Sequence, residues 1–103
     1  MMSLLFHLHF YNPMSTVLVP DYLVNKYSLP SQYQTNAGTI NAILKNFSDQ
    51  YPAVQSFLYD ENNNIRKFIN LFLDSQDIRS LDGLSTYVGE NSEVVIVIAV
   101  AGG

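Results

Sequence analysis

The sequence predicts an α+β protein in which one main helix packs on one face of a mixed β-sheet. Two features lead to this prediction. A single apolar stripe at helical spacing lies near the middle of the chain, with short β-rich segments before and after it. The last of these segments, residues 94–100, is a nearly continuous β-branched run, which is typical of a strand in the centre of a sheet. A hairpin followed by a helix that crosses one sheet face is an α+β roll.

Length and composition restrict the classes of protein to consider. A chain of 103 residues, of which 48% are apolar and 14% charged, can form one compact domain and lacks the composition of a disordered protein. The net charge is −4 and only five residues are basic, so we expect no nucleic-acid partner. The chain has no cysteine, which excludes disulfides and thiol chemistry and fits a cytoplasmic protein. Its longest apolar run is far shorter than the about 20 residues that cross a membrane.

Residues 1–13 differ from the rest, and we expect them to form an N-terminal extension outside the core fold. This stretch is rich in Leu, Phe and His and has no regular period, whereas Met14 opens a segment with the character of an independent start. His7 and His9 would share one side of a strand and offer two metal ligands. Nothing near them suggests a third ligand, so we predict no metal site.

The first hairpin is predicted from two β-rich segments. Residues 16–19 form the first strand, which Pro20 ends because proline has no N–H for the strand ladder. A long, irregular connection over residues 21–28 then leads to a short second strand at residues 32–35.

The main helix begins after an N-cap at Asn36 or Thr39. Its apolar residues recur at the spacing of one helix face: Ile40, Ile43, Leu44, Phe47 and Tyr51. Pro52 ends the helix, because it lacks an N–H and restricts the residue before it. We expect one further helical turn over residues 53–58 and then a turn at residues 60–64, which are dense in Asn and Asp.

The second half of the chain supplies the remaining strands. On a strand at residues 68–73, alternate side chains would face the helix: Ile69, Leu71 and Leu73. Residues 78–79 are predicted as a short edge strand, and residues 81–88 as a loop or helical turn. The final strand, residues 94–100, is expected to be buried on both faces and paired in parallel with the first strand. This is the β-grasp arrangement, with residues 14–99 as the domain.

Several segments resemble the ThiS/MoaD family of ubiquitin-like sulfur carriers. They are residues 66–73 (RKFINLFL), 76–79 (QDIR), 81–86 (LDGLST), 89–94 (GENSEV) and 99–103 (AVAGG). The resemblance extends from Met14 to the end of the chain, and within the family it is greatest to the CysO-type carriers of cysteine biosynthesis. Two features depart from the family pattern. Ile98 stands where the family often has proline, and residues 1–13 usually have no counterpart.

The resemblance implies a carrier whose reactive atom lies at its own C-terminus. An E1-like adenylating enzyme would use ATP to adenylate the Gly103 carboxylate, and a sulfur donor would replace AMP to give a thiocarboxylate. The sulfur would then pass to an acceptor enzyme, which is a cysteine synthase or, as the second choice, the large subunit of molybdopterin synthase. The chain would bind no cofactor and would be a co-substrate rather than an enzyme, or a small subunit if it belongs to molybdopterin synthase.

Residues 100–103 are predicted to be the flexible tail that delivers this carboxylate. These four residues can extend by roughly 13 Å, at about 3.3–3.6 Å each: Val100, Ala101, Gly102 and Gly103. Glycine has no Cβ, so the last two residues suit a narrow channel in a partner. Many chains end in two glycines that have no role, but this pair directly follows a strand of the buried type.

Two phenylalanines are candidate docking residues. If Ile69, Leu71 and Leu73 face the helix, the two phenylalanines Phe68 and Phe72 lie on the open sheet face beside the tail. An activating enzyme could bind them there. The alternatives are that residues 1–13 cover these rings or that the strand faces are reversed. Arg79 is a candidate partner for an acidic group of an enzyme, with a solvated surface role as its alternative.

Two other functions fit the same fold. A ubiquitin-like modifier would be joined through Gly103 to lysines of target proteins. A β-grasp interaction module without tail chemistry would need neither terminal glycine. The sequence does not separate the carrier from the modifier, because both activate the same carboxylate.

Overall fold

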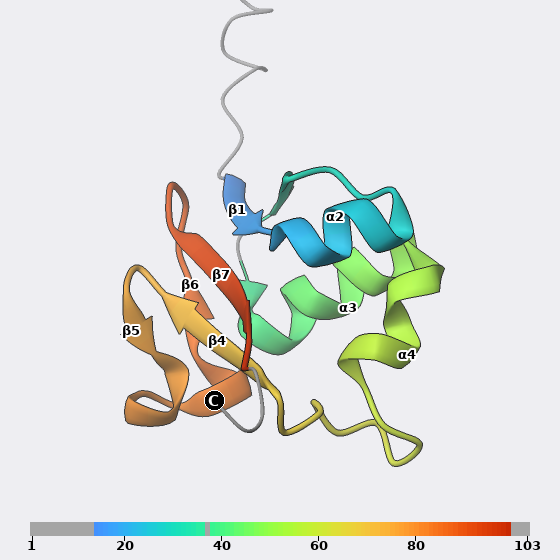
Figure 1. The fold of residues 1–103 in the computed structure, drawn as a ribbon. Helices are drawn as coiled ribbons and strands as arrows, with labels where there is room; N and C mark the ends of the chain where they lie inside the picture. Colours follow the sequence, from blue (N-terminus) through green and yellow to red (C-terminus); the bar gives the residue numbers. More distant parts are fainter. Residues whose placement is uncertain (1–13, 37, 100–103) are drawn as a thin grey trace, which may run out of the picture.

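The computed structural model describes residues 14–36 and 38–99. The expected extension and the expected tail lie outside these ranges, so the predictions made for them stay predictions. The described residues form a five-stranded mixed sheet, a separate pair of short strands and several helices, of which one is the main helix (Figure 1).

The elements follow one another in this order: β1 (Met14–Leu18), α2 (Asp21–Tyr27), β2 (Gln32–Asn36), β3 (Gly38–Thr39), α3 (Ile40–Gln50), η1 (Pro52–Val54), α4 (Gln55–Leu58), β4 (Ile69–Leu73), β5 (Gln76–Asp77), η2 (Ile78–Ser80), η3 (Gly83–Ser85), β6 (Tyr87–Val88) and β7 (Glu93–Ile98). The strand order in the large sheet is β2-β1-β7-β4-β5, and β3 pairs with β6. The last strand, β7, is therefore central, parallel to β1 and antiparallel to β4. This is the β-grasp topology that the sequence predicts.

The apolar stripe of α3 forms the centre of the core. The Thr39 side chain caps the helix by accepting a hydrogen bond from the Ala42 N–H at 3.1 Å, which settles the choice between the two predicted N-caps. Four stripe residues are fully buried: Ile40, Ile43, Leu44 and Phe47. They belong to one core cluster with the inward residues of the central strands, among them Val17, Ile69, Leu71, Val94 and Ile96. The helix ends at Gln50, just before Tyr51 and Pro52, as predicted.

The connection after β1 is a helix, and the prediction of an irregular segment at residues 21–28 is wrong. Asp21 in the first turn and Lys26 in the last turn both interact favourably with the helix dipole, which stabilises the helix. Leu23 is the residue of α2 that is fully buried, so the helix is held by one anchor rather than by a long stripe. Ser28 ends the helix in the left-handed conformation, with φ 55°, and its N–H donates to the Val24 carbonyl.

The predicted edge strand at residues 78–79 is also wrong, because the strand lies two residues earlier. Asp74 and Ser75 both have positive φ and form a tight turn that pairs Gln76 with Leu73. The Asp77 side chain then accepts a hydrogen bond from the Arg79 N–H at 2.9 Å, which starts the 3₁₀ helix η2 instead of a longer strand.

The central strand β7 is buried on one face only. Val94 and Ile96 are buried against the core, whereas Val97 is 37% exposed. The prediction of burial on both faces is therefore wrong, and the β-branched run reflects the central position of the strand rather than a second covering layer. The described residues leave this side of the sheet, which we call the open face, partly exposed, and it leads to the candidate site.

Candidate functional site

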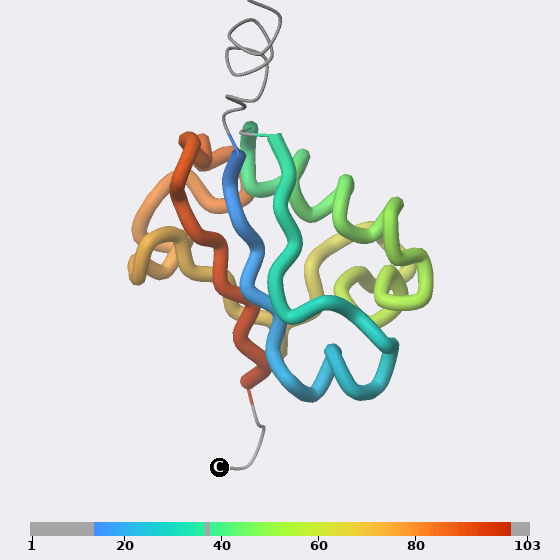
Figure 2. Tube along the Cα trace, turned by 90° about the horizontal axis from the view of Figure 1, so that it is seen from above, coloured from blue at the N-terminus to red at the C-terminus, as the bar shows by residue number. Residues whose placement is uncertain are grey.

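The tail leaves the sheet at a fixed point. β7 ends at Ile98, and the Ala99 N–H donates to the Phe68 carbonyl at 2.7 Å. Figure 2 shows β1 and β7 side by side, and because they run parallel, both end at the same edge of the sheet. The predicted reactive residue Gly103 and the predicted tail residues Val100, Ala101 and Gly102 lie outside the described residues.

The open face near this exit is apolar. Strand pairing places Val95 opposite both Leu18 and Phe72, and Val97 opposite Asn70. The neighbouring residues Ile69 and Leu71 are 6% and 4% exposed on the core side. The predicted assignment of the two faces of β4 is therefore confirmed, and the alternative with reversed faces is wrong.

An apolar hollow of about 740 Å³ lies at the edge where the tail leaves, and we name it the exit groove. Its walls come from β1, β7, α2 and α4, and none of its lining residues is charged. The side chains that define it are Leu18, Pro20, Tyr22, Phe57, Val95 and Val97. Ala99, the last described residue, belongs to the same lining, so the described chain ends within this apolar surface.

Phe68 lies beside the exit groove, and Phe72 lies further along β4. Phe68 is 36% exposed and packs edge-on against Phe57, with ring centroids 5.2 Å apart. Phe57 also contacts Tyr22 at 5.9 Å, so three aromatic rings follow one another next to the exit. Phe72 is four residues beyond Phe68, about 13 Å along a strand, and it is half-buried. The two predicted docking residues therefore do not form one patch on their own.

Sequence reasoning missed the residues that line the exit groove. Tyr22 lies on α2, which was not predicted, and Phe57 lies in the helical turn that was predicted without a role for its side chains. On that short helix Leu58 is fully buried and Phe57 is partly buried, and no pattern in the sequence distinguishes the two.

Arg79 lies away from the exit groove, at the β5 side of the sheet. Its Nε donates to both carboxylate oxygens of Asp77, at 3.0 Å and 3.1 Å, and its Nη2 also pairs with Asp77. These hydrogen bonds stabilise the ionised carboxylate and lower the pKa of Asp77 to about 2. The Arg79 guanidinium is thus already paired within the chain, which limits it as a docking residue for a partner.

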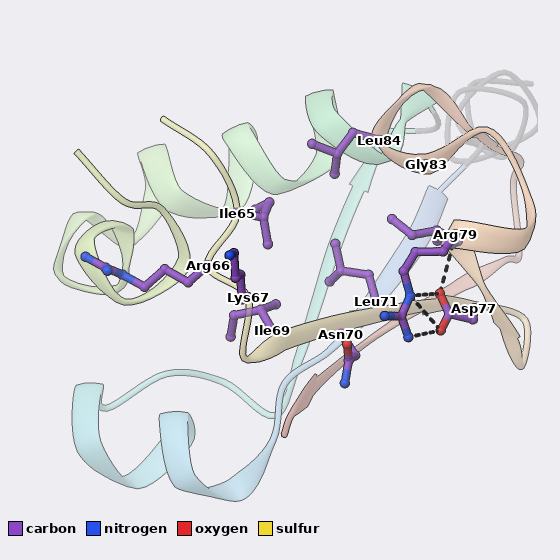
Figure 3. Close-up of a pocket in the computed structure, with 11 residues that line it drawn as sticks. Ile65, Arg66, Lys67, Ile69, Asn70, Leu71, Asp77, Arg79, Gly83 and Leu84 are labelled. Carbon is purple, nitrogen blue, oxygen red and sulfur yellow. Dashed lines mark hydrogen bonds and ion pairs between the residues drawn. The ribbon is translucent and has the colours of Figure 1, made fainter. Parts of the chain in front are cut away.

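Arg79 instead lines a second hollow of about 510 Å³, which we name the basic groove (Figure 3). It lies between the segment before β4, β4 itself and the turns η2 and η3. Its defining residues are Arg66, Lys67, Ile69, Arg79, Gly83 and Leu84.

Three kinds of feature are absent from the described residues. Within residues 14–36 and 38–99, no group of three His, Cys, Asp or Glu side chains could hold a metal ion. No helix in this part of the chain is long and apolar enough to span a bilayer. In the same ranges, no buried side-chain nitrogen or oxygen lacks a hydrogen-bond partner. The described body therefore lacks the unpaired buried polar groups that often mark a catalytic centre.

Comparison with known proteins gives consistent matches over most of the chain. The model of the ThiS family matches residues 27–103. The sulfur carrier protein CysO of Mycobacterium tuberculosis (strain ATCC 25618 / H37Rv) is 26% identical over 90 residues, which are 85% of this chain and 97% of CysO.

Solved structures agree in fold. One chain of the Amycolatopsis orientalis BexX/CysO complex and the small archaeal modifier protein 1 of Methanosarcina acetivorans both superpose with a TM-score of 0.75. The chain of the BexX/CysO complex is 25% identical, and the alignment covers 86% of this chain and 99% of that one. The modifier protein is 22% identical, and the alignment covers 90% of this chain and 99% of the modifier protein. The crystal structure of Mycobacterium tuberculosis CysO follows at a TM-score of 0.72 and 23% identity, covering 84% and 99%.

Proposed function

The chain belongs to the ThiS family, and we therefore propose that it carries sulfur on its own C-terminal residue, Gly103. The observation that best supports this use of the tail is the hydrogen bond from Ala99 to Phe68. It holds the chain at the rim of the exit groove four residues before the end of the sequence. An extended tail of that length spans roughly 13 Å, enough to bring the carboxylate into a partner while the domain stays outside.

The proposed chemistry needs two partners. An E1-like adenylating enzyme binds ATP, a Gly103 carboxylate oxygen attacks the α-phosphorus, and pyrophosphate leaves. A sulfur donor then attacks the acyl carbon, so that a C–S bond forms, the C–O bond to AMP breaks and the thiocarboxylate results. The thiocarboxylate sulfur attacks an electrophile on the acceptor enzyme, and hydrolysis later returns the carboxylate. The chain itself acts as a co-substrate, because both partners supply the catalytic groups.

We assign the exit groove and Phe68 to docking of the activating enzyme. The groove is uncharged, apolar and continuous with the start of the tail, so a partner that covers it also surrounds the path of the carboxylate. Phe68 adds an exposed aromatic ring at its margin, the kind of side chain that anchors interfaces. Phe72 is a weaker candidate because it is half-buried and lies outside the groove lining.

Cysteine biosynthesis is the proposed pathway, with a cysteine synthase as acceptor. A relative that matches 85% of the chain at 26% identity is named sulfur carrier protein CysO. Molybdopterin synthesis is the second choice, since it uses the same carboxylate and fold. Because activation consumes ATP, we place the reaction in the cytoplasm.

Intact-mass measurement tests the proposal. The full chain is incubated with ATP, its cognate activating enzyme and a sulfide source. We expect a mass gain that corresponds to one oxygen replaced by one sulfur, and no gain for a variant that lacks Gly102 and Gly103. If the full chain forms neither adenylate nor thiocarboxylate while a control carrier is activated, the proposal is wrong.

Two other measurements separate the alternatives. A ubiquitin-like modifier, the function named for the small archaeal modifier protein 1, would leave Gly-Gly remnants on lysines of target proteins. A β-grasp interaction module would keep its function after removal of Gly102 and Gly103.

A further inference from the structure

The basic groove combines positive charge with an aliphatic floor. Three of the five basic residues of the chain line it, although the net charge of the chain is −4. Its one acidic lining residue, Asp77, is already paired with Arg79. Much of the remaining lining is aliphatic: Ile65, Ile69, Leu71, Ile78 and Leu84. A complementary occupant therefore needs both carboxylates and aliphatic side chains.

One of the cations, Lys67, is available to such an occupant. Arg66 donates from Nε to the Ser56 carbonyl at 3.0 Å, and its guanidinium points away from the other lining residues (Figure 3), whereas Lys67 is exposed. Within the described residues, neither side chain takes part in an ion pair. Arg66 and Lys67 extend from the segment that leads into β4, as Figure 3 shows. An exposed cation at the mouth of a groove attracts carboxylates.

The edge of β4 indicates the conformation of the occupant. β5 pairs only with Phe72 and Leu73, so among the described strands residues 69–71 have no neighbour on that side. An unpaired strand edge favours an extended segment beside it. Lys67 in the groove lining is also next to Phe68, whose carbonyl accepts the hydrogen bond from the Ala99 N–H. A segment bound there would lie beside the start of the tail.

We propose that the basic groove binds an extended acidic segment of a partner protein, in which carboxylates alternate with aliphatic side chains. Alternation is required because successive side chains of an extended segment point to opposite sides. Aliphatic side chains then contact the floor near Ile69 and Leu84, and a carboxylate meets Lys67. The proposal depends on the proposed function only in that a partner comes to the tail.

Gly83 offers a matched pair of variants for the test. It lines the groove with φ +58°, and a Cβ added there would meet no atom within 4 Å. Asn and Asp are the side chains that best tolerate this left-handed conformation. Gly83→Asn and Gly83→Asp therefore have nearly equal size and strain, and differ by one negative charge at the groove wall. Lys67→Gln removes a cation from the groove, and Lys45→Gln removes one from the ion pair with Asp49 instead.

The experiment is an NMR titration of the ¹⁵N-labelled full chain with two synthetic probes. The acidic probe is the capped peptide Asp-Leu-Glu-Val-Asp-Leu, and the control has lysine in place of each acidic residue. We expect saturable shifts of the Leu71, Gly83 and Leu84 amides with the acidic probe only. Lys67→Gln, and Gly83→Asp relative to Gly83→Asn, should weaken binding about two- to fivefold, and Lys45→Gln should have no effect.

Three results would overturn the proposal: no saturable binding of the acidic probe, equal binding of the basic probe, or shifts confined to the exit groove. The titration needs no ATP, enzyme or sulfur. It can therefore fail while thiocarboxylate forms, or succeed while none forms, which separates this proposal from the proposed function.

Discussion

The anchoring of the tail at Phe68 gives a sharp prediction through the substitution Ala99→Pro. Proline has no N–H, so the 2.7 Å hydrogen bond to the Phe68 carbonyl is lost. The residue before it, Ile98, is already in a strand, a conformation that a following proline accepts. The substitution therefore removes the anchor while β7 keeps its other pairs with β4.

The expected magnitude follows from the worth of one hydrogen bond. An intramolecular hydrogen bond contributes about 0.5–1.5 kcal/mol, which changes the population of the anchored exit by roughly two- to tenfold. If the activating enzyme needs the tail to start at the rim of the exit groove, kcat/KM for adenylation should fall by a similar factor. Ala99→Ser keeps the N–H and is the matched control.

The assay is pyrophosphate release by the activating enzyme at several carrier concentrations. Urea unfolding of both variants is the folding control. We expect both domains to be folded, with the free energy of unfolding lower by about 1 kcal/mol for Ala99→Pro. Equal kcat/KM for the proline and serine variants would refute the claim that the anchor positions the tail.

Three further predictions concern the core, the ion pair and the open face. Phe47→Ala should lower the free energy of unfolding by about 3–5 kcal/mol in urea, because the ring is fully buried under α3. Arg79 lowers the pKa of Asp77 to about 2, so the stability that this pair provides is fully present above about pH 4 and is lost as the pH falls through about 2. In Asp77→Asn, the free energy of unfolding should depend less on pH in the acid range. An unchanged pH dependence would contradict the role given to the Asp77–Arg79 pair. Val97→Lys should weaken binding to the activating enzyme in a calorimetric titration while it changes the unfolding free energy by no more than about 1 kcal/mol, because Val97 is 37% exposed.

The parts of the fold that were predictable are those with strong periodicity. The stripe from Ile40 to Phe47 identifies the main helix because its period follows directly from burial. The β-branched run from Val94 identifies the central strand through its β propensity. The helix α2 was missed because one buried residue, Leu23, provides no period to recognise. Residues 78–79 were misplaced because a side-chain cap by Asp77, rather than a hydrophobic pattern, decides the end of β5.

The candidate site was predictable only in part. The two faces of β4 were assigned correctly from alternation, which puts Phe72 on the open face. The exit groove combines Leu18, Tyr22, Phe57 and Val95 from four separate elements, and local patterns carry no information on such a combination. Arg79 was singled out for a partner, but its nearest acidic group, Asp77, is two residues away in the same turn.

The central claim is that the reactive atom is the carboxyl carbon of Gly103. Its most direct test is fragmentation mass spectrometry of the full chain after activation with ATP and sulfide, beside a chain with one alanine added after Gly103. We expect the sulfur on the C-terminal fragment that ends in Gly103, and no sulfur on the extended chain. Sulfur found elsewhere in the chain, or equal loading of the extended chain, would contradict the account.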